Sequence, residues 1–351
     1  MTAERPTWQL DWPAAPGRVG RAVLKADPST FFVDEDLGLA GFPEQVRDVD
    51  SVVSGEGEHL CFRLEKVGDN TDYIARQLQR LAGCRDQDIG FCGLKDRHAV
   101  TRQWFSVHRP GREADDPAFL AEVSAHWKLL AAHRYVKKLR RGDHRGNVFE
   151  ITLLEVDGKR ENIDAALMVV AKQGCPNYFG GQRFGRDGGN LEQAIRLDPK
   201  RYQRGRRKGR DRHRQGLYLS AARSWLFNQV LGRRVEQGNW QTPLPGEPVS
   251  GSVTGPLWGD GGTTASDQQE QLERSVVAEH PEMEQVFSDT RMKPERRDLI
   301  LQPGQFSWQW QGTDKLTLHF ELAPGQYATT LIGSVFELND SGAASGLAEG
   351  T

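Results

Sequence analysis

A short polar segment between two strand-like runs is the feature that most constrains this 351-residue sequence. Residues 93–102 read Gly-Leu-Lys-Asp-Arg-His-Ala-Val-Thr-Arg, and Asp96 is the one acidic residue among them. The run Ile-Gly-Phe-Cys before this segment is apolar and the run Gln-Trp-Phe-Ser-Val after it alternates, so both predict strands. The polar segment is therefore predicted to be a loop held by two strands, a position where reactive side chains are common.

The charges around Asp96 determine what its carboxylate can do. Lys95, Arg97, His98 and Arg102 supply positive charge, which favours the ionised form of a nearby carboxylate. An ionised, poorly solvated aspartate can act as a base, a metal ligand or a nucleophile. A surface turn with an ordinary ion pair explains the same residues, and spacing alone favours that simpler interpretation.

Hydrophobic periodicity and capping residues predict the surrounding elements. Asn70 is expected to cap a helix that Gly83 ends, and Asp116 is expected to cap the next one. Residues 238–264 have a loop-like composition, and residues 340–351 are expected to be disordered. The predicted strands cover 22–26, 31–35, 59–67, 127–136, 149–156, 297–302, 306–311 and 315–322, and the predicted helices cover 71–81, 116–125, 161–172, 218–237, 268–279 and 324–338.

Five segments of the chain together resemble the TruD family of tRNA pseudouridine synthases. The loop around Asp96 is similar to the family's catalytic motif. The other similar segments begin at Lys25, Gly146, Pro176 and Leu219, and all five follow the family's order. The resemblance extends from about residue 23 to about residue 338, which is nearly the whole chain.

The resemblance implies an α+β architecture, the pseudouridine synthase fold. Its sheet is mixed and largely antiparallel, and an inserted α/β domain, called the TRUD domain, interrupts it. The catalytic domain is expected to comprise residues 1–173 and 302–351, and the inserted domain residues 174–301. The strands predicted from residue 297 onward are expected to return the chain to the first sheet.

The resemblance also implies an activity and a set of site residues. The expected reaction is isomerisation of uridine to pseudouridine in tRNA, at position 13, with Asp96 as nucleophile on a flipped-out nucleotide and with no cofactor or metal. Tyr327 stands where the family commonly has Phe, so the ring is kept and its added hydroxyl needs a partner. The substrate-binding residues implied by the family are Lys25, Phe31, Glu35, Lys95, Asn147, Phe149 and Tyr327.

The distribution of charge indicates a nucleic-acid partner more clearly than the formal net charge of −2 does. Residues 137–145 carry five Lys or Arg against one Asp, and residues 201–214 carry eight against one. Cations that pair with phosphates release counterions, so binding is expected to weaken steeply with salt. The predicted RNA-binding residues are Lys137, Lys138, Arg140, Arg145, Arg183, Arg206, Arg207, Lys208 and Arg210.

Other features exclude several classes of protein. The four cysteines form no C-x-x-C pair, which argues against a zinc site or a disulfide framework and favours a reducing compartment. No apolar run has the length of a membrane span, and no apolar signal sequence precedes residue 21. We therefore expect a cytoplasmic monomer that binds tRNA, with no membrane association and no obligate protein partner.

Two other functions remain open at this point. An RNA-cleaving enzyme would use His98 as a base, with Lys95 or Arg97 stabilising a phosphorane. A non-catalytic RNA-binding module would need only the basic runs and the aromatic residues, which would make Asp96 dispensable.

Overall fold

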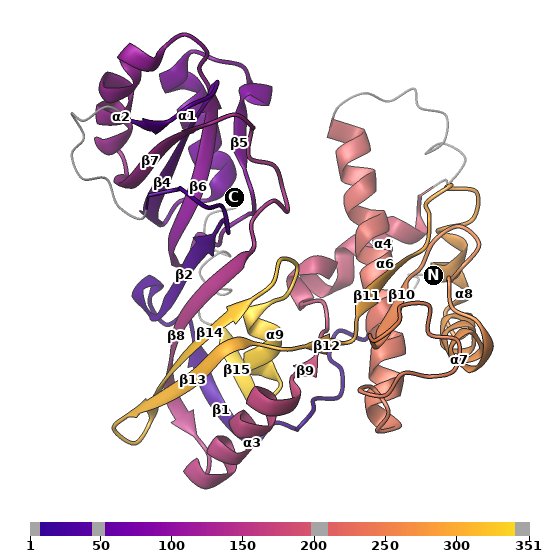
Figure 1. Ribbon diagram of the computed structural model, residues 1–351. Coiled ribbons are helices and arrows are strands. Elements are labelled where there is room, and N and C mark those ends of the chain that lie inside the picture. The colour runs from indigo at the N-terminus through magenta and orange to yellow at the C-terminus, as the bar shows by residue number, and fades with distance from the viewer. Residues whose placement is uncertain (1–7, 44–52, 198–209, 341–351) are drawn as a thin grey trace, which may run out of the picture. The chain divides into compact units, whose positions relative to one another are not determined.

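The computed structural model describes residues 8–43, 53–197 and 210–340 (Figure 1). The chain divides into two compact units. The sheet unit comprises residues 21–158, 303–325 and 338–351, and the helix unit comprises residues 1–20, 159–302 and 326–337. The domain boundaries expected above, at residues 173 and 302, remain a prediction.

One large mixed sheet dominates the sheet unit. Its strands follow the order β13-β14-β8-β2-β6-β4-β7-β3, in which β2–β6 and β3–β7 are parallel and the other neighbours are antiparallel. The α+β class and the mixed, largely antiparallel sheet are thus confirmed. The strands are β1 (Gly20–Leu24), β2 (Phe31–Asp36), β3 (Ser54–Gly55), β4 (His59–Val67), β5 (Ile89–Phe91), β6 (Val100–His108), β7 (Lys128–Tyr135), β8 (Gly146–Asp157), β13 (Gly304–Gln311), β14 (Lys315–Leu322) and β15 (Phe336–Asp340).

Side-chain alternation gives this sheet two distinct faces. Phe31, Val33 and Glu35 of β2 are buried on one side, which we call the front face. The alternate residues of β2, including Asp34 and Asp36, point to the opposite side, which we call the back face. Because Glu35 pairs with Asn147 in β8, the two side chains lie on the same face.

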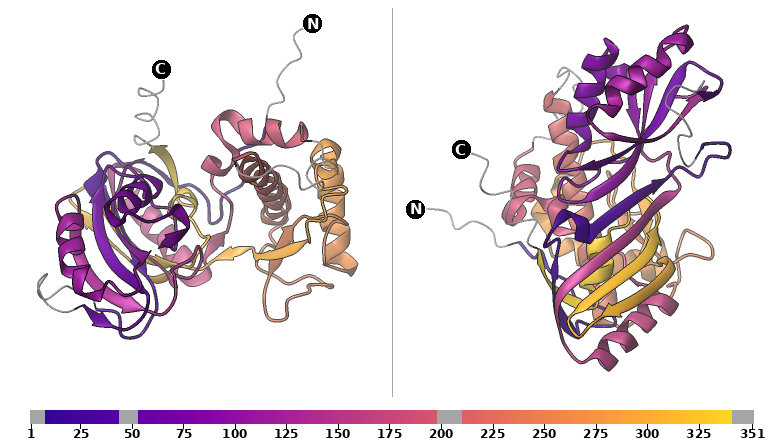
Figure 2. Two further views of the ribbon diagram at one scale, coloured as in Figure 1. Left: turned by 90° about the horizontal axis from the view of Figure 1, so that it is seen from above. Right: turned by 90° about the vertical axis from the view of Figure 1, so that its left-hand side faces the viewer.

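Two helices cover part of the front face, α1 (Thr71–Ala82) and α2 (Asp116–Ser124) (Figures 1 and 2). The Asn70 side chain accepts a hydrogen bond from the Tyr73 amide at 2.8 Å, and Gly83 ends α1 with φ 60°. Both capping predictions for α1 are confirmed. Ile74 and Leu78 are buried against β4 and β6, whereas Tyr73 is 41% exposed.

The prediction that Asp116 is the N-cap of α2 was wrong. Asp115 occupies the N-cap position, and Asp116 is the first helical residue. The Asp116 side chain is 1% exposed and accepts hydrogen bonds from Arg109 Nε at 3.2 Å and Arg134 Nε at 2.7 Å. Two buried guanidinium groups therefore draw this carboxylate inward, away from the helix terminus.

The helix unit is organised around one long helix, α6 (Arg210–Glu236). Trp225, Phe227 and Leu231 of α6 pack in a core with Phe179 and Phe184. The other helices of this unit are α3 (Arg160–Gln173), α4 (Gly189–Ile195), α7 (Asp267–Ala278), α8 (Pro281–Gln285) and α9 (Ala328–Gly333), and its strands are β9 (Cys175–Pro176), β10 (Thr254–Leu257), β11 (Glu295–Asp298) and β12 (Ile300–Leu301). Short 3₁₀ turns span Pro28–Thr30, Asp86–Asp88, Glu113–Asp115, Gly181–Phe184 and Arg186–Gly188 along the chain.

Three expectations were wrong in this part of the chain. The predicted loop at 238–264 contains β10, which pairs with β11. β11 and β12 pair with β10 and β9, so of the strands predicted from residue 297 onward it is β13 and β14 that return to the large sheet. The last predicted helix stops at Gly333, because Phe336 is buried and begins β15. Residues 341–351, expected to be disordered, lie outside the described residues.

None of the helices in the described part of the chain has the length and apolar composition that crossing a bilayer requires.

Candidate functional site

The polar loop predicted around Asp96 connects β5 to β6, and α1 holds it in place. Thr71, the first residue of α1, accepts a hydrogen bond from the Lys95 amide at 2.9 Å and donates one to Gln103 Oε1 at 2.9 Å. Gln103 Nε2 donates in turn to the Gly93 carbonyl. Thr71 and Gln103 are at most 1% exposed, so these bonds fix the loop from inside the protein.

Replacing Thr71 with valine should therefore destabilise the protein. The change keeps the shape but leaves the Lys95 amide and the Gln103 side chain without their buried partner, which costs about 1–3 kcal/mol. Urea unfolding of Thr71→Val and Thr101→Val measures the difference, since Thr101 is 0% exposed and its hydroxyl has no hydrogen-bond partner among the described residues. Thr101→Val should be neutral or stabilising, and equal losses in both variants would contradict the assignment.

Asp96 pairs with a buried cation from a distant part of the chain. Lys25 Nζ donates to Asp96 Oδ2, and the two side chains are 4% and 29% exposed. The His98 amide donates to Asp96 Oδ1 at 3.0 Å. Burial raises the pKa of Asp96, but the hydrogen bond and charge of Lys25 and the His98 amide outweigh it and lower that pKa below its ordinary value. Asp96 is thus ionised at neutral pH.

The backbone at Lys25 is unusual. Its φ of 56° lies in the left-handed region, which costs energy in a residue other than glycine. The turn carries the ammonium group back toward Asp96 and over the Phe31 ring, whose centroid is 4.8 Å away.

Aromatic rings form the wall beside this ion pair. Phe31 and Phe149 meet edge to face at 6.4 Å, and Phe149 stacks on Phe320 at 5.1 Å. Phe31 is 5% exposed and Phe149 is 8% exposed, so little of either ring is open to solvent in this structure. Phe32, the neighbour of Phe31, lies on the back face, where the Arg102 guanidinium covers it at 4.9 Å.

A second ion pair lies beside the first. Lys95 Nζ donates to Glu35 Oε2 at 2.6 Å and to Asn147 Oδ1 at 2.8 Å. The Glu35 side chain is 0% exposed and also accepts a hydrogen bond from the Trp104 amide. Asn147 Nδ2 lies 3.4 Å from His144 Nε2. Of the positive charges that the sequence places next to Asp96, Lys95 thus serves Glu35 and Asn147, whereas Lys25 pairs with Asp96.

Lys66 belongs to the same cluster as Lys25, Asp96, Lys95, Glu35 and Asn147. The sequence analysis did not identify it as a site residue. It is 2% exposed, and its ammonium donates to the carbonyl oxygens of Asp69 and Asp96, the latter at 3.1 Å. Burial lowers its pKa to about 8, although Asp69 and Asp96 act in the opposite direction. The signal was present, because Lys66 occupies the apolar phase of the alternation Leu60, Phe62, Leu64 in β4.

A lysine whose pKa falls on folding destabilises the folded state below that pKa. The folded protein binds fewer protons than the unfolded chain between pH 8 and 10.5, so stability rises across that range. The difference in free energy of unfolding between Lys66→Met and wild type should therefore favour the variant more at pH 7 than at pH 10, by up to about 3 kcal/mol. Urea unfolding at both pH values tests this; Lys128→Met, at an exposed lysine of β7, should show no such trend.

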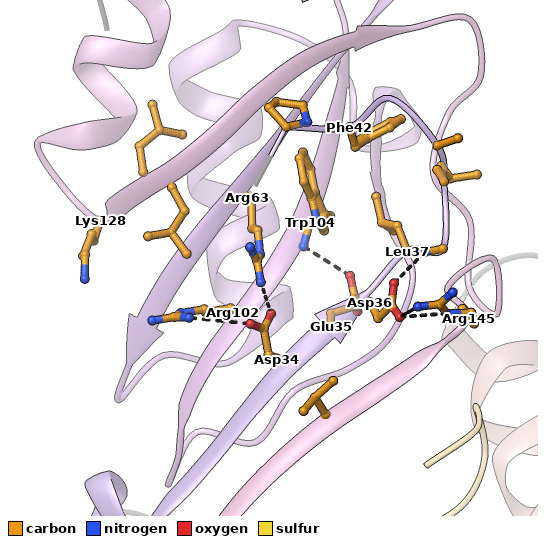
Figure 3. A pocket seen from close by; sticks show the side chains of 17 residues that line it. Asp34, Glu35, Asp36, Leu37, Phe42, Arg63, Arg102, Trp104, Lys128 and Arg145 are labelled. Atoms are coloured by element: carbon orange, nitrogen blue, oxygen red, sulfur yellow. Dashed lines mark hydrogen bonds and ion pairs between the residues drawn. The ribbon is translucent and has the colours of Figure 1, made fainter. Parts of the chain in front are cut away.

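A hollow of about 1070 Å³ lies on the back face, away from Asp96. Figure 3 shows Asp34 between Arg63 and Arg102, and Arg145 against Asp36. Each of these cations has a carboxylate partner, so the hollow has the character of a solvated, charge-balanced sheet surface. The chemistry of the candidate site is on the other face.

The remaining predicted residues are not part of this cluster. Lys137 and Arg140 are exposed, Lys138 donates to the Gln87 carbonyl, and Arg145 pairs with Asp36. In the helix unit, Arg183 bonds to the hydroxyls of Ser220 and Ser224, and the Tyr327 ring lies 6.3 Å from that of Phe179. Arg206, Arg207 and Lys208 lie outside the described residues, as does the side chain of Arg210 at the start of α6. Their roles stay predictions.

The cluster offers the ionised carboxylate of Asp96 beside the buried ammonium of Lys25, a second ion pair between Lys95 and Glu35, the Asn147 amide and aromatic rings. Such an arrangement suits nucleophilic attack on a planar ring or a sugar. Among the described residues, no group of three or more His, Cys, Asp or Glu side chains is arranged to hold a metal ion.

Comparison with protein families gives one match that covers most of the chain. The family described as tRNA pseudouridine synthase D (TruD) matches residues 15–193 and 249–335. These ranges contain the whole Asp96 cluster, whereas the basic run at 201–214 lies between them.

Curated relatives and a solved structure agree with this match. A tRNA pseudouridine synthase D from Marinobacter nauticus is 56% identical over 342 residues, covering 96% of this chain and 97% of its own length. One from Hydrogenovibrio crunogenus is 36% identical and covers 90% and 93%. A crystal structure from Methanosarcina mazei described as TruD has 21% identity and a TM-score of 0.62 over 91% of this chain and 94% of its own, which supports the fold.

Proposed function

This chain belongs to the TruD family of tRNA pseudouridine synthases, and from that premise we propose that it converts uridine to pseudouridine at position 13 of tRNA, with Asp96 as the nucleophile. The observation that carries the proposal is the paired, ionised carboxylate of Asp96 beside the rings of Phe31 and Phe149. His98, the base that a nuclease would require, donates its backbone amide to this carboxylate.

The reaction conserves every atom of the substrate. The bond between ribose C1′ and uracil N1 breaks, the base turns, and a bond forms between C1′ and C5. The proton on C5 is lost and N1 gains one, so there is no net redox change. The nucleotide must leave the base stack to react, at a cost of a few kcal/mol.

The side chains of the cluster divide this work. Asp96 adds to the uracil ring or to C1′, and Lys25 keeps it ionised and oriented. Phe31 and Phe149 border the uracil ring, and Asn147 holds the base edge with Lys95 behind it. Glu35, whose side chain is fully buried, pairs with Lys95 and holds it in place.

Incubation of the purified protein with unmodified tRNA transcripts, without metal or nucleotide, tests the proposal. Chemical mapping should find pseudouridine at one position in the D-stem region, with the RNA intact. Intact, unmodified tRNA retained by the protein would instead support a binding module. Fragmented tRNA would support a nuclease.

A further inference from the structure

A chain of hydrogen bonds fixes the direction of the Asn147 amide. Glu35 is 0% exposed and accepts from Lys95 Nζ at 2.6 Å. The same ammonium reaches the Asn147 side chain at 2.8 Å. Because an ammonium group only donates, the oxygen of the amide must face Lys95 and the nitrogen must face away.

The nitrogen end of the amide meets His144. Asn147 Nδ2 and His144 Nε2 are 3.4 Å apart, and His144 is 8% exposed. Since Nδ2 carries hydrogens, Nε2 must accept, which places the imidazole hydrogen on Nδ1. Nδ1 has no hydrogen-bond partner among the described residues, so the bond to Asn147 alone selects this tautomer.

We propose that Lys95 and His144 make the Asn147 amide a discriminator between uracil and cytosine, with His144 as a positioning residue. This inference rests on the proposed function, in which Asn147 holds the base edge. The amide has one lone pair and one hydrogen left over, in a fixed order. Uracil presents N3–H beside the acceptor O4, whereas cytosine presents an acceptor N3 beside the donor N4–H₂. A freely turning amide matches either base by flipping, but a locked amide matches one.

Acid should unlock the amide. Burial lowers the pKa of His144 below 6.5, with Lys95 acting in the same direction and Glu35, Asp143 and Asp36 acting against it. As the pH falls through that pKa, Nε2 gains a proton and a donor then faces the Nδ2 donor. Discrimination is therefore present at neutral pH and lost in acid.

Two substitutions at His144 separate positioning from simple packing. His144→Gln keeps an acceptor for Asn147 Nδ2 and does not titrate. His144→Leu fills a similar volume but has no acceptor. The glutamine variant should keep the discrimination at all pH values, and the leucine variant should lose it at all pH values.

The measurement uses two tRNA transcripts that differ only by U or C at the modified position. The C transcript serves as a competitive inhibitor of the U transcript from pH 5 to pH 7.5, and the ratio of its Ki to the KM of the U transcript reports discrimination. A good bidentate contact discriminates by roughly tenfold or more, so His144→Leu should lower the ratio at pH 7.5 by that factor. Wild type should show the same fall in acid, and His144→Gln should not.

The possible outcomes distinguish failure of this inference from failure of the proposed function on which it rests. No conversion of the U transcript by wild type overturns the proposed function and the inference with it. Normal conversion with the same ratio in wild type and His144→Leu overturns the inference alone. If the leucine variant does not fold, an unchanged acid dependence in His144→Gln overturns it as well.

Discussion

Replacing Asp96 with asparagine is expected to lower turnover by at least about 10⁴-fold, the scale of losses when a catalytic nucleophile is removed. Asparagine still fits the loop and still accepts from the His98 amide, but it carries no charge and is a poor nucleophile. Binding of tRNA should change by no more than a few-fold, because phosphate contacts dominate affinity. Single-turnover assays of pseudouridine formation, paired with filter binding of the same transcript, separate the two effects.

The control for this variant is Asp72→Asn, at an exposed aspartate in the first turn of α1. It makes the same chemical change close to the loop and should retain turnover. Normal activity in Asp96→Asn would rule out Asp96 as the nucleophile. Loss of both activity and tRNA binding would point to misfolding, which urea unfolding detects.

Lys25→Met is expected to have the second-largest effect, a loss of about 10²-fold in kcat/KM at neutral pH, typical of removing one electrostatic contact from an active site. Without the Lys25 ammonium, burial is the main remaining influence and raises the pKa of Asp96. The reactive carboxylate is lost as pH falls through its pKa. The acid limb of the pH profile should therefore move to higher pH in the variant.

A profile of kcat/KM from pH 4 to pH 8 measures this shift, with Lys128→Met as the control. Lys128 pairs with Glu65 at 3.0 Å, and its side chain is 64% exposed. Its loss should leave the acid limb in place. An unmoved acid limb in Lys25→Met would show that the Lys25–Asp96 pair does not set the ionisation of Asp96.

Local features of the fold were predictable from the sequence because short-range physics determines them. The alternation over residues 59–67 matches β4 at both ends, and Asn70 and Gly83 mark the ends of α1. The predictions of secondary structure failed where contacts between residues distant in sequence determine the structure. β10 is short and consists of Thr-Gly-Pro-Leu, which carries no strand signal of its own, and pairing with β11 creates it.

The candidate site shows the same division. The loop and its isolated carboxylate could be located from the order of residues, and the family resemblance supplied the neighbouring residues. Which lysine pairs with Asp96 could not be predicted, because Lys25 is 71 residues away and Lys95 is adjacent in sequence. The register between β2 and β8 places Glu35 opposite Asn147, and Lys95 bonds to these two side chains and not to its sequence neighbour Asp96.

The length of α6 has a mechanical consequence. Its 27 residues form one rod about 40 Å long at 1.5 Å per residue. Its first turn lies in the basic run. Farther along the helix, the hydroxyl groups of Ser220 and Ser224 accept hydrogen bonds from Arg183. Arg183 and the turn Gly181–Phe184 are therefore tied, through a single continuous helix, to the end of α6 that lies in the basic run.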